Sequence, residues 1–140
     1  MKHQVLSTLV VMFLASPTFC QGTLSVEVTN IKEAKGTIRV ALFDNEKDFL
    51  KKPLHGKIVK ASQDKIQVNF DNLPAGEYAI SVIHDENENG DLDSNLMGIP
   101  KEGFGFGNDA MGMFGPPSFE KAKIKWDGSE MKVGVKIKYM

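Results

Sequence analysis

Apolar residues recur at every second position in five separate stretches of this 140-residue chain. The alternating sets are Leu24, Val26 and Val28; Ile38, Val40 and Leu42; Ile66, Val68 and Phe70; Tyr78, Ile80 and Val82; and Val133, Val135, Ile137 and Tyr139. A period of two turns one side of an extended strand toward a core and the other side toward water. The pattern therefore predicts short strands, each with one buried and one solvated face.

Turn-forming residues separate these stretches, as in Leu73-Pro74-Ala75-Gly76 and Asp127-Gly128-Ser129. Residues 57–61 and 119–126 show weaker strand patterns, and residues 45–52, which end before Pro53, favour one or two helical turns. Six or seven short strands in one small domain predict an all-β fold, an antiparallel β-sandwich with Greek-key connections.

The first residues have the layout of a secretory signal peptide. Lys2 supplies a positive start, residues 5–15 are apolar, and residues 16–20 then break a helix. The apolar run is too short to span a bilayer, which takes about 20 residues. We expect residues 1–20 to be removed on export, which leaves a periplasmic or extracellular protein without a transmembrane segment.

Cleavage is expected near Cys20, with Thr18 and Cys20 as the small residues before the cut. A second possibility is that Cys20 is the lipidated cysteine of a bacterial lipoprotein, although Phe19 stands where such signals have a small residue. Residues 21–140 form one domain that contains no cysteine. Core packing must therefore stabilise it, and a bound metal would add to that stability.

The charge balance is close to neutral, with 17 Lys and Arg residues against 18 Asp and Glu residues. Proteins that bind nucleic acids usually carry a basic stripe. We therefore expect no nucleic-acid partner.

The polar stretch Asp-Glu-Asn-Glu-Asn-Gly-Asp-Leu-Asp at residues 85–93 has the spacing of a calcium loop. Oxygen-bearing side chains occupy alternate positions, and Gly90 stands sixth, where such a loop turns sharply. The predicted ligands are Asp85, Asn87, Asn89, Asp91 (through its carbonyl) and Asp93.

One departure weakens the similarity to a helix-loop-helix site. The twelfth position holds Leu96 instead of a bidentate glutamate, and no helix is predicted on either side. A further acid such as Glu102, Asp109 or Glu120 would have to complete the ligands. The alternative is a polar turn without metal, because Asn and Asp bond to their own backbone.

Residues 94–118 form one long connection rich in Gly, Phe and Met. Long loops in small domains are uncommon and often functional. Two interpretations remain open for Phe104, Phe106, Met113 and Phe114. They either fold back over the sandwich core or form an exposed apolar surface for a ligand or partner. The Gly-Phe-Gly-Phe-Gly run is not a phosphate cradle, since no strand–helix unit surrounds it.

His84 shares the inward face of its strand, so we expect it to be a packed histidine bonded to a carbonyl. His55 and His84 lack the close spacing of metal-ligand pairs, so we expect no zinc or copper site built from neighbouring residues. A hydrolase set of Ser94, His84 and Asp85 or Asp93 is the less favoured alternative, because no G-x-S-x-G turn marks Ser94. We predict no catalytic residue.

Three blocks of the sequence resemble an exported bacterial family known as domain of unknown function 2141 (DUF2141). They are His84-Asp85-Glu86-Asn87-Glu88-Asn89-Gly90-Asp91-Leu92-Asp93, Met97-Gly98-Ile99-Pro100-Lys101-Glu102-Gly103-Phe104-Gly105-Phe106 and Phe114-Gly115-Pro116-Pro117-Ser118-Phe119-Glu120. The resemblance implies a single exported domain with a prealbumin-like or immunoglobulin-like sandwich. It implies no activity, substrate or catalytic residue.

These observations favour an exported, non-catalytic binding or structural module whose acidic loop binds Ca²⁺ and orders the long connection after it. The alternative is a carrier of a small apolar ligand or partner, with its pocket at the Gly/Phe/Met loop. Buried phenylalanines and converging oxygens would favour the first, and exposed phenylalanines around a hollow would favour the second.

Overall fold

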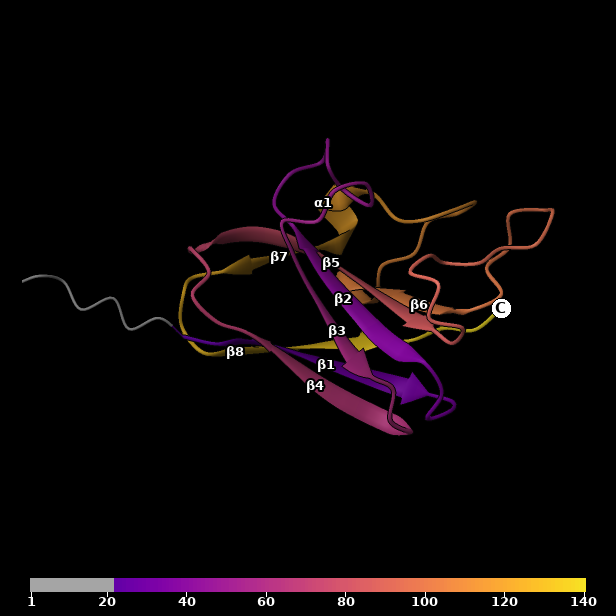
Figure 1. Ribbon diagram of the computed structural model, residues 1–140. Coiled ribbons are helices and arrows are strands. Elements are labelled where there is room, and N and C mark those ends of the chain that lie inside the picture. The colour runs from indigo at the N-terminus through magenta and orange to yellow at the C-terminus, as the bar shows by residue number, and fades with distance from the viewer. Residues whose placement is uncertain (1–21) are drawn as a thin grey trace, which may run out of the picture.

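The computed structural model describes residues 22–140, which form two packed β-sheets (Figure 1). The predicted signal peptide and Cys20 lie outside these residues. The first sheet has the order β4-β1-β8, with β1 at Leu24–Ile31, β4 at Asp64–Phe70 and β8 at Met131–Lys136. Within residues 22–140, no helix is both long and apolar enough to cross a bilayer.

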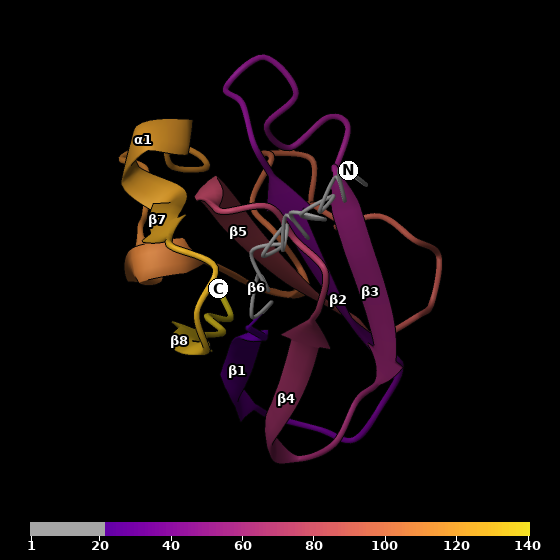
Figure 2. The same ribbon diagram turned by 90° about the vertical axis from the view of Figure 1, so that its left-hand side faces the viewer.

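The second sheet has the order β3-β2-β5-β6. Its strands are β2 (Thr37–Phe43), β3 (His55–Lys60), β5 (Gly76–Asp85) and β6 (Gly103–Phe106). β7 (Lys123–Trp126) pairs with the first half of β5, along the edge that β6 shares. The short helices η1 (Gly107–Asp109) and α1 (Phe119–Ala122) join β6 to β7. Figure 2 shows α1 and β7 on the side of the sheet away from β3.

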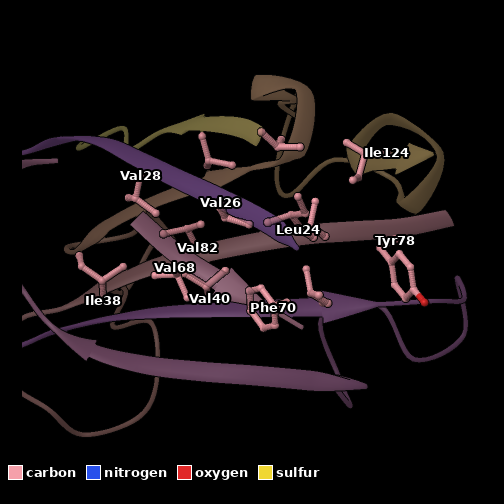
Figure 3. Packing of buried hydrophobic residues seen from close by; sticks show 14 of the residues in the cluster. Leu24, Val26, Val28, Ile38, Val40, Val68, Phe70, Tyr78, Val82 and Ile124 are labelled. Carbon is pink, nitrogen blue, oxygen red and sulfur yellow. The ribbon is translucent and has the colours of Figure 1, made fainter. Parts of the chain in front are cut away.

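The predicted all-β sandwich is confirmed, and each of the five alternating stretches contributes a strand. One pairing differs from the antiparallel expectation, because β1 and β8 run parallel. The inward side chains lie between the two sheets, where Val26, Val28, Val40 and Val82 face one another (Figure 3). Val26 and Val28 are fully buried, as the period-two pattern requires.

The second sheet is covered on its outer face as well, which the alternation did not predict. A second apolar cluster lies there, made of Phe43, Phe49, Ala79, Phe104, Phe106, Phe119 and Ala122. The turn after β2, helix α1 and the outward side chains of β6 supply it. The residues of β5 from Tyr78 to Val82 are therefore all buried, as is typical of strands covered on both faces.

Three local predictions were wrong. Residues 45–52 form hydrogen-bonded turns instead of helix, and Leu50 there has a left-handed φ of 59° that ends any helical turn. Residues 119–122 are helical, with Ser118 as N-cap, before the predicted strand begins at Lys123. Residues 103–106, expected to be loop, form β6.

Close packing explains the two glycines of β6. A Cβ atom on Gly103 would lie 2.5 Å from Ile137 Cγ2, and one on Gly105 would lie 2.8 Å from Val135 Cγ1. The strand thus turns its glycines toward the segment around β8 and its phenylalanines toward the second cluster. Phe104 also exchanges two backbone hydrogen bonds with Lys138, which ties the C-terminal segment to this sheet.

Candidate functional site

The acidic loop at residues 85–93 begins at the last residue of β5 and leads toward β6 (Figure 1). Asp85 is completely buried and faces the outer side of the sheet. Its Oδ1 accepts the Asn89 N–H at 3.2 Å, and its Oδ2 accepts the Gly90 N–H at 2.8 Å. The Arg39 guanidinium lies 3.6 Å from the same Oδ2. The first position of the loop therefore fixes the backbone of the fifth and sixth positions.

The side chains of the third, fifth and ninth positions meet at one point. Asn87 Nδ2 donates to Asp93 Oδ2 at 2.5 Å, and Asn89 Nδ2 donates to Asp93 Oδ1 at 2.9 Å. Asn87 Oδ1 accepts the Asn89 N–H, and Asn89 Oδ1 accepts the Asp91 N–H. The loop is closed into a compact ring around the Asp93 carboxylate, with Glu88 and Gly90 in left-handed conformations.

Glu102 hydrogen-bonds to both ends of the acidic loop. Its Oε1 accepts the Glu86 N–H at 3.0 Å and its Oε2 accepts the Asp93 N–H at 3.1 Å. This glutamate is only 5% exposed. The sequence suggested Glu102 as a further metal ligand, whereas its two oxygens bond to backbone N–H groups, sixteen and nine residues away in the chain.

The other suggested acids have different partners. Asp109 Oδ1 accepts the Lys136 N–H at 2.9 Å, and Glu120 pairs with Lys123. Asp91 is exposed, and Leu96, at the twelfth position, lies on the surface. Within residues 22–140, no three His, Cys, Asp or Glu side chains cluster as metal ligands would. A cation here would be bound by Asp93 together with amide and carbonyl oxygens.

Two amide rotations would turn oxygen atoms toward the Asp93 carboxylate. The amides of Asn87 and Asn89 present nitrogen to Asp93, and rotation of each terminal amide would present oxygen to the same point. Carboxylate, amide and carbonyl oxygens are the ligands that Ca²⁺ takes. Rotation would break the bonds that Asn87 Oδ1 and Asn89 Oδ1 accept from backbone N–H groups, while Asp85 and Glu102 would still bond to the loop backbone.

The acidic loop continues into a second loop at residues 94–100, which has hydrogen bonds of its own. Ser94 and Pro100 pair as an isolated bridge, and Asn95 Oδ1 accepts the N–H groups of Met97 and Ile99 at 2.9 and 3.0 Å. Sequence reasoning missed this role of Asn95. The signal that could have found it was an Asn followed three residues later by glycine, a pattern typical of a tight turn.

An apolar concavity of about 650 Å³ lies between loop 94–100 and the segment 110–116. Its lining includes Leu92, Phe104 and Phe106, loop residues from both segments, and the C-terminal Met140. Phe104 and Phe106 are 6% and 7% exposed, whereas Met113 and Phe114 are 89% and 100% exposed. The four predicted loop residues are therefore split between a buried floor and an exposed rim.

His84 is buried on the inner face, as expected. One ring nitrogen, Nε2, lies 2.7 Å from the Lys35 carbonyl oxygen, and the other, Nδ1, lies 2.7 Å from the Tyr139 hydroxyl. Ser94 is exposed on a loop of the outer side, and both ring nitrogens of His84 already have partners. The structure does not bring Ser94 and His84 together with Asp85 or Asp93 as a catalytic set, and Asp85 is bonded to the Asn89 and Gly90 N–H groups.

The sequence of the chain matches one described protein family. Residues 26–134 match a family described as an uncharacterized protein conserved in bacteria (DUF2141). The chain belongs to this family. The DUF2141 match spans both sheets, the acidic loop and both loops of the concavity, and it ends before Met140. No curated protein and no solved structure matches the chain.

Proposed function

We propose that this protein is an exported, non-catalytic binding module in which a calcium ion bound by residues 85–93 orders the loop that follows. The observation that carries the proposal is the convergence of Asn87, Asn89 and Asp93 on one point, with the Asp85 carboxylate fixing the turn at Gly90. Export rests on the signal-like sequence of residues 1–20.

The chemistry of the loop supports a hard divalent cation. Asp85, Asp91 and Asp93 lie within nine residues together with Glu86 and Glu88, against one guanidinium from Arg39. A doubly charged ion would offset the mutual repulsion of these carboxylates. Because Asp93 and Ser94 are neighbours, fixing Asp93 would also fix the start of loop 94–100.

The proposal predicts that calcium stabilises the domain. A chain of residues 21–140 should melt at a higher temperature in millimolar CaCl₂ than in EGTA, since a ligand bound only to the folded state adds about 2.7 kcal/mol at a concentration 100-fold above its Kd. Asp93→Asn removes a ligand charge but retains the side-chain shape, and should abolish most of the increase. The melting curves are measured by circular dichroism.

Glu88→Gln is the matched control, because it removes one negative charge from an exposed position of the same loop. It should retain the calcium response. Identical melting curves of the wild-type chain in calcium and in EGTA would refute the calcium site. An equal loss of the response in both variants would show that the charge of the loop, rather than coordination by Asp93, attracts the ion.

A second candidate function is binding of a small apolar molecule in the concavity. The specific observation is that Met97, Met113 and Phe114 are exposed at its rim. Burying each of these side chains against a ligand would stabilise the complex by about 1.5–3 kcal/mol. A hollow of about 650 Å³ has the size of a small-molecule pocket.

This candidate predicts that an environment-sensitive fluorescent dye brightens when mixed with the protein. Phe114→Ser should reduce the signal, because this ring is on the rim and supports no core. Phe104→Ser is unsuitable, since Phe104 belongs to the second apolar cluster and its loss would unfold that region. A wild-type protein that leaves the dye dark would exclude this function.

A further inference from the structure

Methionine residues gather around the apolar concavity. Residues 22–140 contain five methionines, and four of them line the apolar concavity. Met97 comes from loop 94–100, Met111 and Met113 come from the segment after η1, and Met140 is the C-terminal residue. Three parts of the chain that are distant in sequence therefore contribute the same side chain to one place.

Three of these four side chains are mostly exposed, whereas Met111 packs against the second apolar cluster. Met97, Met113 and Met140 are 83%, 89% and 72% exposed. The fifth methionine, Met131, behaves differently and packs against the main apolar cluster from β8. Methionine is unbranched and has three rotatable bonds, so exposed methionines can turn their sulfurs toward a common centre.

The backbone holds two of the sulfur-bearing residues at a tight turn. Met111 and Met113 flank Gly112, at which a Cβ atom would lie 2.3 Å from the Gly115 carbonyl oxygen. The chain thus folds back on itself immediately after Met113. Phe104 and Phe106 form an apolar floor beneath the hollow, which keeps water from one side of any bound ion.

Thioether sulfur is a soft, uncharged ligand that selects Cu(I) over hard cations. It is not protonated, so protons do not compete with the metal as they do for His or Cys. Residues 22–140 contain no cysteine, so methionine is the only source of sulfur ligands in this part of the chain. Aromatic rings beside the hollow add attraction for a cation.

We propose that the concavity binds one Cu(I) ion through the sulfurs of Met97, Met111, Met113 and Met140. The expectation that no copper site forms from neighbouring residues concerned histidine spacing, whereas these ligands come together only in the folded chain. The proposal does not rest on the calcium loop, because the two sites use different residues and ions of different softness.

The test uses a chain of residues 21–140 in which the methionine methyl groups carry ¹³C. Titration with silver nitrate, a redox-inert probe for Cu(I), in chloride-free buffer should shift the methyl resonances of the four concavity methionines and saturate at one ion per chain. The Met131 resonance should stay in place. Competition with Cu(I)–bicinchoninate under anaerobic conditions should show transfer of one Cu(I) to the protein.

Replacing all four concavity methionines by leucine keeps the hollow apolar and removes its sulfurs. This variant should lose Ag(I) and Cu(I) binding, and Met131→Leu should retain both. Retention of binding in the fourfold variant would overturn the proposal, and so would silver-induced shifts that are equal at Met131. The shifts of the wild-type chain decide the question even if the fourfold variant does not fold. If the fourfold variant still binds the dye but not the metal, the hollow is intact and the sulfurs account for metal binding.

Discussion

At the scale of single residues, the roles of polar side chains depend on partners that the sequence does not bring together. The spacing of Asp85, Asn87, Asn89 and Asp93 predicted a loop that curls around one point, and the side chains of Asn87, Asn89 and Asp93 do meet. The role of Glu102 could not be predicted, because its hydrogen bonds to Glu86 and Asp93 exist only after β5 and β6 pair.

The two tyrosines of the chain show how burial changes acid–base behaviour. The Tyr78 hydroxyl donates to the Pro74 carbonyl oxygen at 2.5 Å, and the Tyr139 hydroxyl lies beside His84 and accepts the Lys32 N–H. Burial, the largest cause, raises the pKa of both phenols. The Lys32 N–H partly offsets this for Tyr139, and nearby carboxylates raise the pKa of both phenols further. Tyr78 thereby connects β5 to the turn before it, and Tyr139 connects the C-terminal segment to β5.

These raised pKa values predict a loss of stability in alkaline solution. An unfolded tyrosine ionises near pH 10, whereas the folded protein retains the proton to a higher pH. The stabilisation is therefore complete below about pH 10 and is lost as the pH rises from there through the folded-state pKa. The rise in tyrosinate absorbance should occur at higher pH in the native protein than in urea.

Tyr139→Phe serves as the control for this titration, since it leaves Tyr78 as the single titrating phenol. The remaining transition should still lie above that of the unfolded chain, because burial raises the pKa of Tyr78 independently. Superimposable native and unfolded titrations would contradict the burial argument.

At the scale of secondary-structure elements, periodicity predicted strands well where one face is buried, as in β1, where Leu24, Val26 and Val28 are fully buried and Glu27 is not. It failed for β6, because Gly103 and Gly105 alternate with phenylalanines in a pattern that also suits a flexible loop. Only contact with the segment around β8 explains why glycine is needed there. The reason for glycine in β6 is therefore a tertiary contact, which the local sequence does not show.

The explanation of β6 predicts the effect of adding one methyl group. Gly105→Ala would place a Cβ atom 2.8 Å from Val135 Cγ1 and 2.9 Å from the Lys136 carbonyl oxygen. Overpacking of this kind should lower the free energy of unfolding by about 1–3 kcal/mol. Urea unfolding, followed by the fluorescence of the buried Trp126, measures the change.

Gly134→Ala is the matched control, because Gly134 also lies in a strand but a Cβ atom added there would meet nothing within 4 Å. We expect its free energy of unfolding to stay within about 0.5 kcal/mol of the wild-type value. Equal destabilisation by both substitutions would mean that contact with β8 does not explain the glycine at position 105, since strand propensity alone favours alanine over glycine.

At the scale of the whole molecule, the loops that form the two candidate sites share one end of the sandwich (Figure 1). The acidic loop passes directly into loop 94–100, and Leu92 belongs to both the acidic loop and the lining of the concavity. The sequence predicted that a metal would order the following loop. It also offered a pocket at the Gly/Phe/Met loop as the alternative. It could not predict that Met140 joins the lining, because Lys138 meets Phe104 only in the folded chain.

This arrangement predicts that calcium slows hydrogen exchange beyond its own ligands. Fixing Asp93 should protect the backbone N–H groups of Met97 and Ile99, which bond to Asn95 in the next loop. β3 should not respond, because it lies at the opposite edge of the sheet from β6. Exchange measured by mass spectrometry with calcium and with EGTA should show protection in residues 86–99 of the wild-type chain and none in Asp93→Asn. Protection confined to residues 85–93 would mean that the ion binds without ordering the loop, and the concavity would then be independent of calcium.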